Sequence, residues 1–233
     1  MSELQLTSVS SGYGKVGIVN DVSLDIRPGE IVAVIGRNGV GKTTLMKTIV
    51  GEIRPTKGRI EFGYYDLTRM RPSQRARLGV GYVPQGRGIF ARLTVGANLS
   101  LGRTVGNAKR VALDRAFKYF PILEKRESQL AGSMSGGEQQ QLAIGRVLCG
   151  DPKLLLLDEP SEGIQPSIVK EIAGTILRLR NEASLGIIIV EQNLTLIQAV
   201  ADRCLVMDKG AIVATIAPEE LDDPETARRY LAI

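Results

Sequence analysis

Residues 30–43 read EIVAVIGRNGVGKT, and this stretch decides the fold. Its first part is a short apolar run rich in β-branched residues, which predicts a buried strand over Ile31–Ile35. The rest, from Gly36 to Thr43, fits the pattern GxxxxGK[ST], in which glycines let successive backbone N–H groups point at one phosphate. A chance glycine-rich turn is the alternative, and the preceding strand argues against it. The sequence therefore predicts a phosphate-binding loop between a strand and a helix that begins after Gly41.

The side chains at the end of this loop are candidates for nucleotide binding. Lys42 offers a mobile positive charge to the β- and γ-phosphates, and the Thr43 hydroxyl can ligate Mg²⁺. Thr44 offers a second hydroxyl to another phosphate. The predicted nucleotide-binding residues of the loop are Asn38, Gly39, Gly41, Lys42, Thr43 and Thr44.

A second stretch, residues 154–160, reads LLLLDEP. It predicts a buried strand over Leu154–Leu157 that delivers two carboxylates to the edge of a sheet where ligands bind. Asp158 is expected to organise Mg²⁺ through its water shell, and Glu159 to polarise an attacking water. A strand that ends in Asp-Glu would be weak evidence alone, and the phosphate loop strengthens it.

A third stretch, residues 131–148, reads AGSMSGGEQQQLAIGRVL. Ser135 and two glycines precede a predicted helix over Gln139–Leu148, and a hydroxyl with free N–H groups at a helix start can bind an anion. The alternative is an ordinary N-cap serine followed by a flexible glycine pair. The stretch is therefore a second candidate anion site on the same chain.

Hydrophobic patterning predicts an α/β fold that forms a single domain over residues 1–233. A nucleotide-binding core over 1–85 and 150–233 would enclose a helical subdomain over 86–149. Helices are expected after Gly41, Ser135, Pro166 and Gln192, over 105–119, and as a short cap over 218–233. Parallel strands are predicted at Ile31–Ile35, Val80–Val83, Leu154–Leu157 and Ile187–Val190, and antiparallel strands at Leu4–Val9, Ile18–Ile26 and Arg59–Phe62.

Composition narrows the possible chemistry. Histidine is absent from the 233 residues, which removes the commonest metal ligand and the commonest general base. Cys149 and Cys204 are too few for a disulfide framework, so both are expected to be core thiols. No uninterrupted apolar run of about 18 residues and no signal-peptide pattern is present, so no membrane-spanning segment is expected.

The net charge of +5 is compatible with nucleic acid, an anionic membrane surface or phosphate ligands. No nucleic-acid motif with interleaved aromatic residues occurs, so nucleic acid is not an expected partner. One cluster of arginines stands out, and it is expected on a solvated helix surface, with lipid headgroups or a partner as the alternative. The cluster comprises Arg69, Arg71, Arg75 and Arg77.

These stretches, in this order and over nearly the whole chain, resemble the ATP-binding-cassette family. The resemblance implies an ATPase that uses ATP and Mg²⁺, with a P-loop NTPase core, an N-terminal antiparallel β subdomain and an inserted helical subdomain. It also implies a head-to-tail dimer, in which each ATP lies between the Lys42 loop of one subunit and Ser135 and Gly137 of the other. Residues 161–164 lie where the family communicates between its two ATP sites.

The same resemblance assigns roles to three further residues. Tyr13 matches the aromatic residue on which adenine stacks, although a turn aromatic is the alternative. Gln85 matches the glutamine that senses Mg²⁺ and the γ-phosphate, with a surface turn as the alternative. Gln192 stands where most members carry histidine, and its amide can donate a hydrogen bond but cannot carry charge. The predicted catalytic residues are Lys42, Glu159 and Gln192, and the predicted metal ligands are Thr43, Gln85 and Asp158.

Residues 82–95, YVPQGRGIFARLTV, and residues 190–193, VEQN, resemble the second ATPase subunit of importers for branched-chain amino acids and for urea or short amides. By resemblance, Gln85 slightly favours the urea and amide importers, because the amino-acid members often carry Glu at this position. Gly96 and Ala97 differ from the family, in which an acidic pair is common at these two positions. Such importers combine two different membrane permeases, a second ATPase subunit and an extracytoplasmic binding protein, with the ATPases peripheral at the cytoplasmic face of the membrane. A homodimer stays open as an alternative.

Three other functions remain as alternatives. A soluble cassette of translation or DNA repair would use the same ATP site, but those relatives usually carry two cassettes or long inserts. A subunit that binds ATP without hydrolysing it is compatible with Gln192, although Lys42, Asp158 and Glu159 argue against it. An ATPase of an exporter or lipid transporter has the same size. Most of those carry the histidine that the VEQN segment replaces, so this segment argues against that function.

Overall fold

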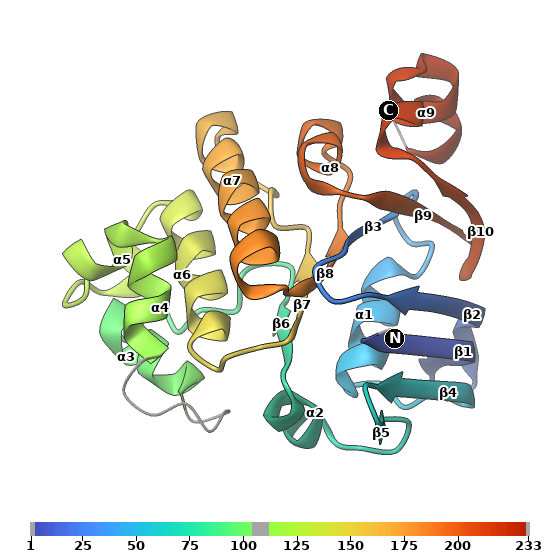
Figure 1. Cartoon of the computed structure of the whole chain (residues 1–233), viewed down its shortest axis with the longest axis horizontal. Helices are drawn as coiled ribbons and strands as arrows, with labels where there is room; N and C mark the ends of the chain where they lie inside the picture. Colours follow the sequence, from blue (N-terminus) through green and yellow to red (C-terminus); the bar gives the residue numbers. More distant parts are fainter. Residues whose placement is uncertain (1–2, 104–111, 232–233) are drawn as a thin grey trace.

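The computed structural model describes residues 3–103 and 112–231 and contains a central six-stranded sheet with strand order β10-β9-β3-β8-β7-β6 (Figure 1). Five of these strands are parallel, and β10 pairs antiparallel with β9 at one edge. The apolar runs predicted from the sequence are fully buried in β3, β7 and β8, as expected for strands covered on both faces. The strands are β3 (Ile31–Ile35), β6 (Val80–Val83), β7 (Leu154–Asp158), β8 (Gly186–Val190), β9 (Arg203–Asp208) and β10 (Ala211–Ile216).

A second, four-stranded antiparallel sheet has the order β2-β1-β4-β5 and lies beside the central sheet (Figure 1). The helix α1 (Lys42–Val50) packs between the two sheets, and its Leu45, Met46 and Ile49 are buried in their shared core. The predicted mixed α/β fold with a smaller antiparallel sheet is therefore confirmed. The strands of this sheet are β1 (Leu4–Tyr13), β2 (Val16–Ile26), β4 (Lys57–Phe62) and β5 (Tyr65–Asp66).

A group of helices covers the opposite face of the central sheet. Alternate leucines of β7 separate the two faces, because Leu155 and Leu157 pack towards this helical group and Leu154 and Leu156 pack towards α1. The helix α6 therefore packs on the face of the sheet opposite to α1. The helices on this side are α3 (Val95–Gly102), α4 (Ala112–Tyr119), α5 (Pro121–Lys125), α6 (Gly136–Leu148) and α7 (Pro166–Ala183).

Several element boundaries differ from the prediction. The helix α6 begins at Gly136, directly after Ser135 as expected, and so extends the predicted run Gln139–Leu148 by three residues, because Ser135 caps it and both glycines join its first turn. The part of the predicted helix over 105–119 that precedes residue 112 lies outside the described residues. The expected helix after Gln192 is α8 (Leu194–Val200), and the Asn193 side chain caps it by accepting from Leu196 N at 3.1 Å.

The predicted single cap over 218–233 was wrong, because two short helices occupy this segment. A 3₁₀ helix spans Pro218–Asp222 and α9 spans Pro224–Tyr230. The break falls at Asp223, whose carboxylate accepts from Thr226 N at 2.9 Å and caps α9. Proline in the next position has no N–H to continue the first helix and is well placed in the first turn of the second.

The prediction that the arginine cluster is solvated was wrong for Arg75. Arg75 lies in α2 (Pro72–Leu78) and is only 1% exposed. Its guanidinium donates to the carbonyl oxygens of Thr48 at 2.8 Å and Ile49 at 2.6 Å, which are carbonyls at the C-terminal end of α1. Burial lowers the pKa of Arg75 to about 10. This arginine therefore ties α2 to the end of the helix that follows the phosphate loop.

Both cysteines are buried, as expected, and burial raises the pKa of each thiol to about 12. In the described part of the chain, no helix has the length and apolar character needed to cross a membrane.

Candidate active site

The predicted site residues gather at the carboxyl edge of four neighbouring strands of the central sheet, β3, β8, β7 and β6. The phosphate loop follows β3, Asp158 ends β7, and Gln85 and Gln192 follow β6 and β8. In open α/β sheets this edge is where ligands bind. Side chains that are far apart in the sequence therefore lie together because the strands that carry them are adjacent.

The phosphate loop needs glycine at positions where the backbone turns into the left-handed region. Gly36 has φ 146°, and a Cβ there would lie 2.3 Å from the Met207 carbonyl oxygen. Gly41, with φ 109°, immediately precedes α1 and leaves the N–H groups of its first turn directed at the loop. The loop therefore has the open helix N-terminus that a phosphate requires.

Lys42 is buried within this loop. Its Nζ donates to the carbonyl oxygens of Gly36 at 2.6 Å and Arg37 at 2.9 Å. Burial lowers the pKa of Lys42, and the nearby carboxylates of Glu159 and Asp158 oppose that shift. The ammonium is thus held next to the loop N–H groups by carbonyls that a phosphate oxygen can replace.

Asp158 is 1% exposed and accepts hydrogen bonds from two hydroxyls. Thr43 Oγ1 donates to its Oδ1 at 3.2 Å, and the Tyr82 hydroxyl donates to its Oδ2 at 3.2 Å. Burial raises the pKa of Asp158, whereas these two hydrogen bonds lower it. The predicted metal ligands Thr43 and Asp158 are therefore in direct contact.

This oxygen donor set fits Mg²⁺. No cluster of three or more acidic, cysteine or histidine side chains suited to a metal occurs within residues 3–103 and 112–231. Mg²⁺ commonly takes one or two protein oxygens and completes its shell with water and phosphate oxygens. The Thr43 hydroxyl, the Asp158 carboxylate and the side-chain oxygen of Gln85 match that mode of binding.

Each oxygen of the Glu159 carboxylate accepts a hydrogen bond from one amide side chain. Gln85 Nε2 donates to its Oε2 at 3.0 Å, and Gln192 Nε2 donates to its Oε1 at 3.0 Å. Gln192 also donates to Asn38 Oδ1 at 2.7 Å, so it joins the phosphate loop to the carboxylate. Two predicted site residues, Gln85 and Gln192, therefore contact Glu159 directly, and Asn38 is linked to it through Gln192. The backbone of Glu159 itself has φ 49°. A non-glycine residue in this region is uncommon and is typical of functional sites.

Sequence analysis missed two residues that organise the site. Glu191 is buried, and its carboxylate accepts from the backbone N–H groups of Ser161 at 2.9 Å, Gln192 at 2.8 Å and Asn193 at 2.9 Å. It thereby joins the loop after β7 to the loop after β8. The second missed residue is Tyr82, which bonds Asp158. Both strands that carry Tyr82 and Asp158 were predicted, and because β6 pairs with β7, their pairing could have placed Tyr82 near Asp158. Nothing in the sequence indicated which groups the Glu191 carboxylate contacts.

Thr44 and Tyr13 belong to the surroundings of this group. Thr44 is buried in α1, next to Thr43. Tyr13 ends β1 and is 52% exposed, so its ring is accessible to a flat ligand. Ser11, two residues earlier, joins β1 to α1 through its hydroxyl, 2.6 Å from Thr48 Oγ1.

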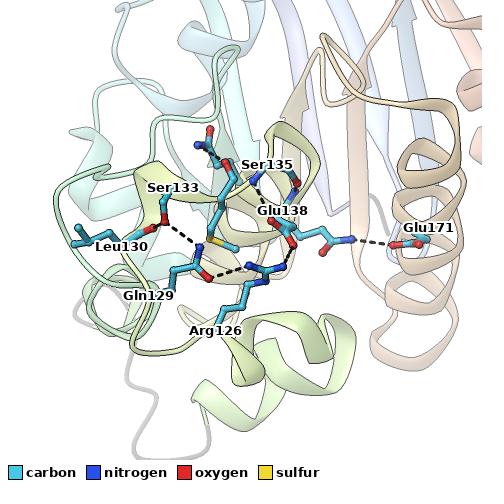
Figure 2. Close-up of polar contacts among 10 residues, drawn as sticks. Arg126, Gln129, Leu130, Ser133, Ser135, Glu138 and Glu171 are labelled. Carbon is cyan, nitrogen blue, oxygen red and sulfur yellow. Dashed lines mark hydrogen bonds and ion pairs between the residues drawn. The ribbon is translucent and has the colours of Figure 1, made fainter.

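Ser135 lies at the start of α6 (Figure 2), and within the described residues no hydrogen bond joins it to Lys42, Glu159 or Gln192. It is exposed, its N–H donates to Glu138 Oε2 at 2.9 Å, and its hydroxyl accepts weakly from Glu138 N at 3.4 Å. Gly137 is buried, because a Cβ there would lie 2.7 Å from Ile168 of α7. The second glycine of the pair thus has a packing role in addition to the predicted ligand-binding one.

Comparisons with known proteins agree with this geometry. Residues 19–162, more than half of the chain, match the family described as ABC transporter. The chain is 43% identical over 212 residues, 90% of this chain and 91% of the relative, to the high-affinity branched-chain amino acid transport ATP-binding protein BraG of Pseudomonas aeruginosa. It is also 35% identical over 237 residues, 99% of this chain and 98% of the relative, to the lipopolysaccharide export ATP-binding protein LptB of Haemophilus influenzae.

A solved structure, the ADP conformation of the ABC transporter cassette MJ1267, has a TM-score of 0.84 and 27% identity and covers 99% of this chain and 98% of its own. A phosphate loop, an acidic strand end and an N-capped Ser-Gly-Gly segment thus lie in a fold shared with a nucleotide-bound cassette. The chain therefore belongs to the ABC transporter family, as an ATP-hydrolysing subunit.

Proposed function

We propose that this chain is an ATPase subunit of an importer for branched-chain amino acids, urea or short amides, bound peripherally at the cytoplasmic face of the membrane. The observation that carries the ATPase part is the contact of the Gln85 and Gln192 amides with the Glu159 carboxylate, together with the hydrogen bond from Gln192 to Asn38 of the phosphate loop. The similarity to BraG, over nine-tenths of the chain, supports the amino-acid cargo.

In the proposed mechanism, Lys42 binds the β- and γ-phosphates and Glu159 accepts a proton from the attacking water. Gln85 and Gln192 keep the Glu159 carboxylate oriented, since each donates to one of its oxygens. Thr43, Asp158 and Gln85 would hold Mg²⁺, which supplies positive charge to the phosphate oxygens when bound. Tyr82 keeps Asp158 in place through its hydroxyl.

The proposal includes a head-to-tail dimer with a second cassette, either another copy of this chain or a related subunit. Within residues 3–103 and 112–231, no hydrogen bond joins the start of α6 to the phosphate loop, and α6 and α1 pack on opposite faces of the sheet. A serine and free N–H groups at a helix start nevertheless form an anion site. Ser135 and Gly137 would therefore complete the ATP site of the partner cassette.

A pocket of about 420 Å³ between α2, β6, α3 and α6 offers a docking place for a permease. Phe90 and Leu101 at its mouth are exposed, and Tyr82, which bonds Asp158, is part of its wall. We propose that an apolar side chain from a cytoplasmic helix of the permease enters this pocket. Movement there would reach the ATP site through Tyr82 and Gln85.

Affinity purification of the chain from gently solubilised native membranes tests this proposal. We expect two permeases and a second cassette to co-purify, with a binding protein that is then screened against leucine, urea and acetamide. Recovery of the chain alone, or with ribosomes or DNA, would contradict the transport function.

A second candidate cargo is lipid, because LptB is 35% identical over nearly the full length of both chains. The same purification separates the two cargoes. Lipid export predicts permeases without an amino-acid or amide binding protein, whereas import predicts that the binding protein is present.

Replacing Gln192 with Ala is expected to lower kcat for ATP hydrolysis about tenfold to a hundredfold and to change ATP affinity about twofold or less. The amide donates to Glu159 and Asn38, so its loss frees the carboxylate without removing Lys42. Steady-state phosphate release gives kcat, and equilibrium binding to the Glu159→Gln chain gives the affinity.

The matched control is Gln198→Ala in α8, because its amide also donates to a carboxylate, that of Asp222 at 2.7 Å, but at an exposed site. Gln198→Ala is expected to keep both the kcat for ATP hydrolysis and the affinity for ATP. Equal losses of hydrolysis and ATP binding in Gln192→Ala would show that Gln192 holds ATP rather than the carboxylate.

A further inference from the structure

A chain of polar contacts extends from the end of α5 to the start of α6 and surrounds Ser135 (Figure 2). Arg126, which follows α5, forms an ion pair with Glu138, with Nη2 2.9 Å from Oε1. The other carboxylate oxygen of Glu138 accepts from the N–H of Ser135 at 2.9 Å. One carboxylate thus joins the arginine to the backbone of the serine.

The arginine is itself held in place by a second set of bonds in the same loop (Figure 2). Its Nη1 donates to Gln129 Oε1 at 2.9 Å, and Gln129 Nε2 donates to Ser133 Oγ at 2.9 Å. Ser133 Oγ donates in turn to the Leu130 carbonyl oxygen at 2.8 Å. A planar guanidinium held at two of its nitrogens has a fixed direction, which a flexible ammonium would lack.

Glu138 creates an electrostatic difficulty for an anion site. A carboxylate in the first turn stabilises the helix, because it lies at the positive end of the helix dipole. The same negative charge, one turn from Ser135, would repel a phosphate that approaches the free N–H groups. The Glu138 side chain is 17% exposed and that of Arg126 is 38% exposed, so solvent screens the charge of this carboxylate only partly.

We propose that Arg126 is a positioning residue for the ATP of the partner cassette: it neutralises Glu138 and fixes the N-cap at Ser135, so that the start of α6 accepts a phosphate. This inference rests on the proposed head-to-tail dimer. Arg126 does not touch the nucleotide. Its contribution is made only when the dimer closes, because α6 and α1 pack on opposite faces of the sheet and, within the described residues, no hydrogen bond joins the start of α6 to the Lys42 loop of its own chain.

The test measures ATP-dependent dimerisation of the purified full chain by sedimentation, in a Glu159→Gln background that retains ATP. Adding Arg126→Gln is expected to weaken dimerisation at least about tenfold, because it leaves Glu138 uncompensated. Affinity for ADP, measured on the monomer, is expected to stay unchanged. Raising the salt from about 0.05 to 0.5 M is expected to reduce the difference in dimerisation between the Arg126→Gln chain and the background chain, since salt adds screening to the partly exposed carboxylate of Glu138.

Two further variants separate charge compensation from a structural role. Combining Arg126→Gln with Glu138→Gln removes the uncompensated charge and is expected to restore most of the dimerisation. Arg126→Lys keeps the positive charge but loses the planar guanidinium that bonds through two nitrogens. Its dimerisation is therefore expected to be weaker than that of the background chain and stronger than that of Arg126→Gln. If Arg126 only maintained the structure of the loop, the double variant would dimerise as weakly as Arg126→Gln or more weakly.

The matched control is Arg59→Gln, which removes an exposed arginine paired with Glu61 at 3.1 Å on the antiparallel sheet. It is expected to dimerise like the background chain. Unchanged dimerisation in Arg126→Gln, or no recovery in the double variant, overturns the inference. Failure of the Glu159→Gln chain to dimerise with ATP, both alone and mixed with the second cassette that co-purifies with it, overturns the proposed head-to-tail dimer instead.

Discussion

Replacing Glu159 with Gln is expected to reduce ATP hydrolysis by a factor of about 10²–10³ while ATP binding is preserved and the closed dimer lasts longer. The substitution keeps the size of the side chain, but it removes the negative charge, the ability to accept a proton and one of the two oxygens that accept from Gln85 and Gln192. Because ATP binding depends on Lys42 and the loop N–H groups, the nucleotide should stay bound. Phosphate release measures hydrolysis, and sedimentation with retained nucleotide measures the closed dimer.

The surroundings of Glu159 explain why its removal should be so costly. Two amides donate to its two oxygens, so the carboxylate is oriented before any water arrives. Its strained backbone at φ 49° is fixed by a hydrogen bond from its N–H to the Val190 carbonyl oxygen at 2.9 Å. No histidine exists in the sequence that could replace it as a base.

Glu171→Gln is the control for this prediction. Glu171 is an exposed carboxylate that also accepts from a glutamine amide, that of Gln141 at 3.1 Å, but between α6 and α7. Its replacement is expected to leave turnover within about twofold of the original. Unchanged turnover in Glu159→Gln would move the catalytic base to another residue.

The parts of the fold that sequence could predict are those whose residues carry a local signal. The buried strands β3, β7 and β8 are continuous aliphatic runs. Gly36 to Thr43 is a motif that requires a strand before it and a helix after it, so it predicts its neighbouring elements. The strand β9 carries a comparable signal, since Cys204 to Met207 is apolar and buried, but it was not recognised. Its hairpin to β10 is marked by Lys209 and Gly210, both at positive φ.

Residues that act through distant partners left no such signal. Arg75 sits among exposed arginines in the sequence, and only the packing of α2 against the end of α1 gives its guanidinium buried carbonyls to bond. Glu191 looks like a strand-end charge, yet it holds N–H groups from two loops. Such contacts depend on which strands are neighbours and on how loops turn, and spacing along the chain encodes neither.

Replacing Lys42 with Ala is expected to weaken ATP binding about a hundredfold or more and to abolish hydrolysis at accessible ATP concentrations. The Lys42 ammonium is buried within the loop, where the Gly36 and Arg37 carbonyl oxygens hold it at 2.6 and 2.9 Å. Without it, the phosphates would lose this buried positive charge and would lie beside the carboxylates of Glu159 and Asp158, which repel them. Equilibrium binding of ATP to the monomer, at low protein concentration, measures the loss.

A matched control separates this effect from general damage to α1. Lys47→Ala removes a lysine from the last turn of the same helix, where a positive charge only complements the helix dipole. It is expected to keep ATP affinity and to lose about 0.3–1 kcal/mol of folding free energy. The Lys42→Ala chain should have a melting temperature close to that of the parent chain. The two lost hydrogen bonds reduce stability, but the substitution also removes the cost of burying an ammonium, the same burial that lowers the pKa of Lys42. An unaltered ATP affinity in a folded Lys42→Ala chain would mean that the loop N–H groups alone hold the phosphates.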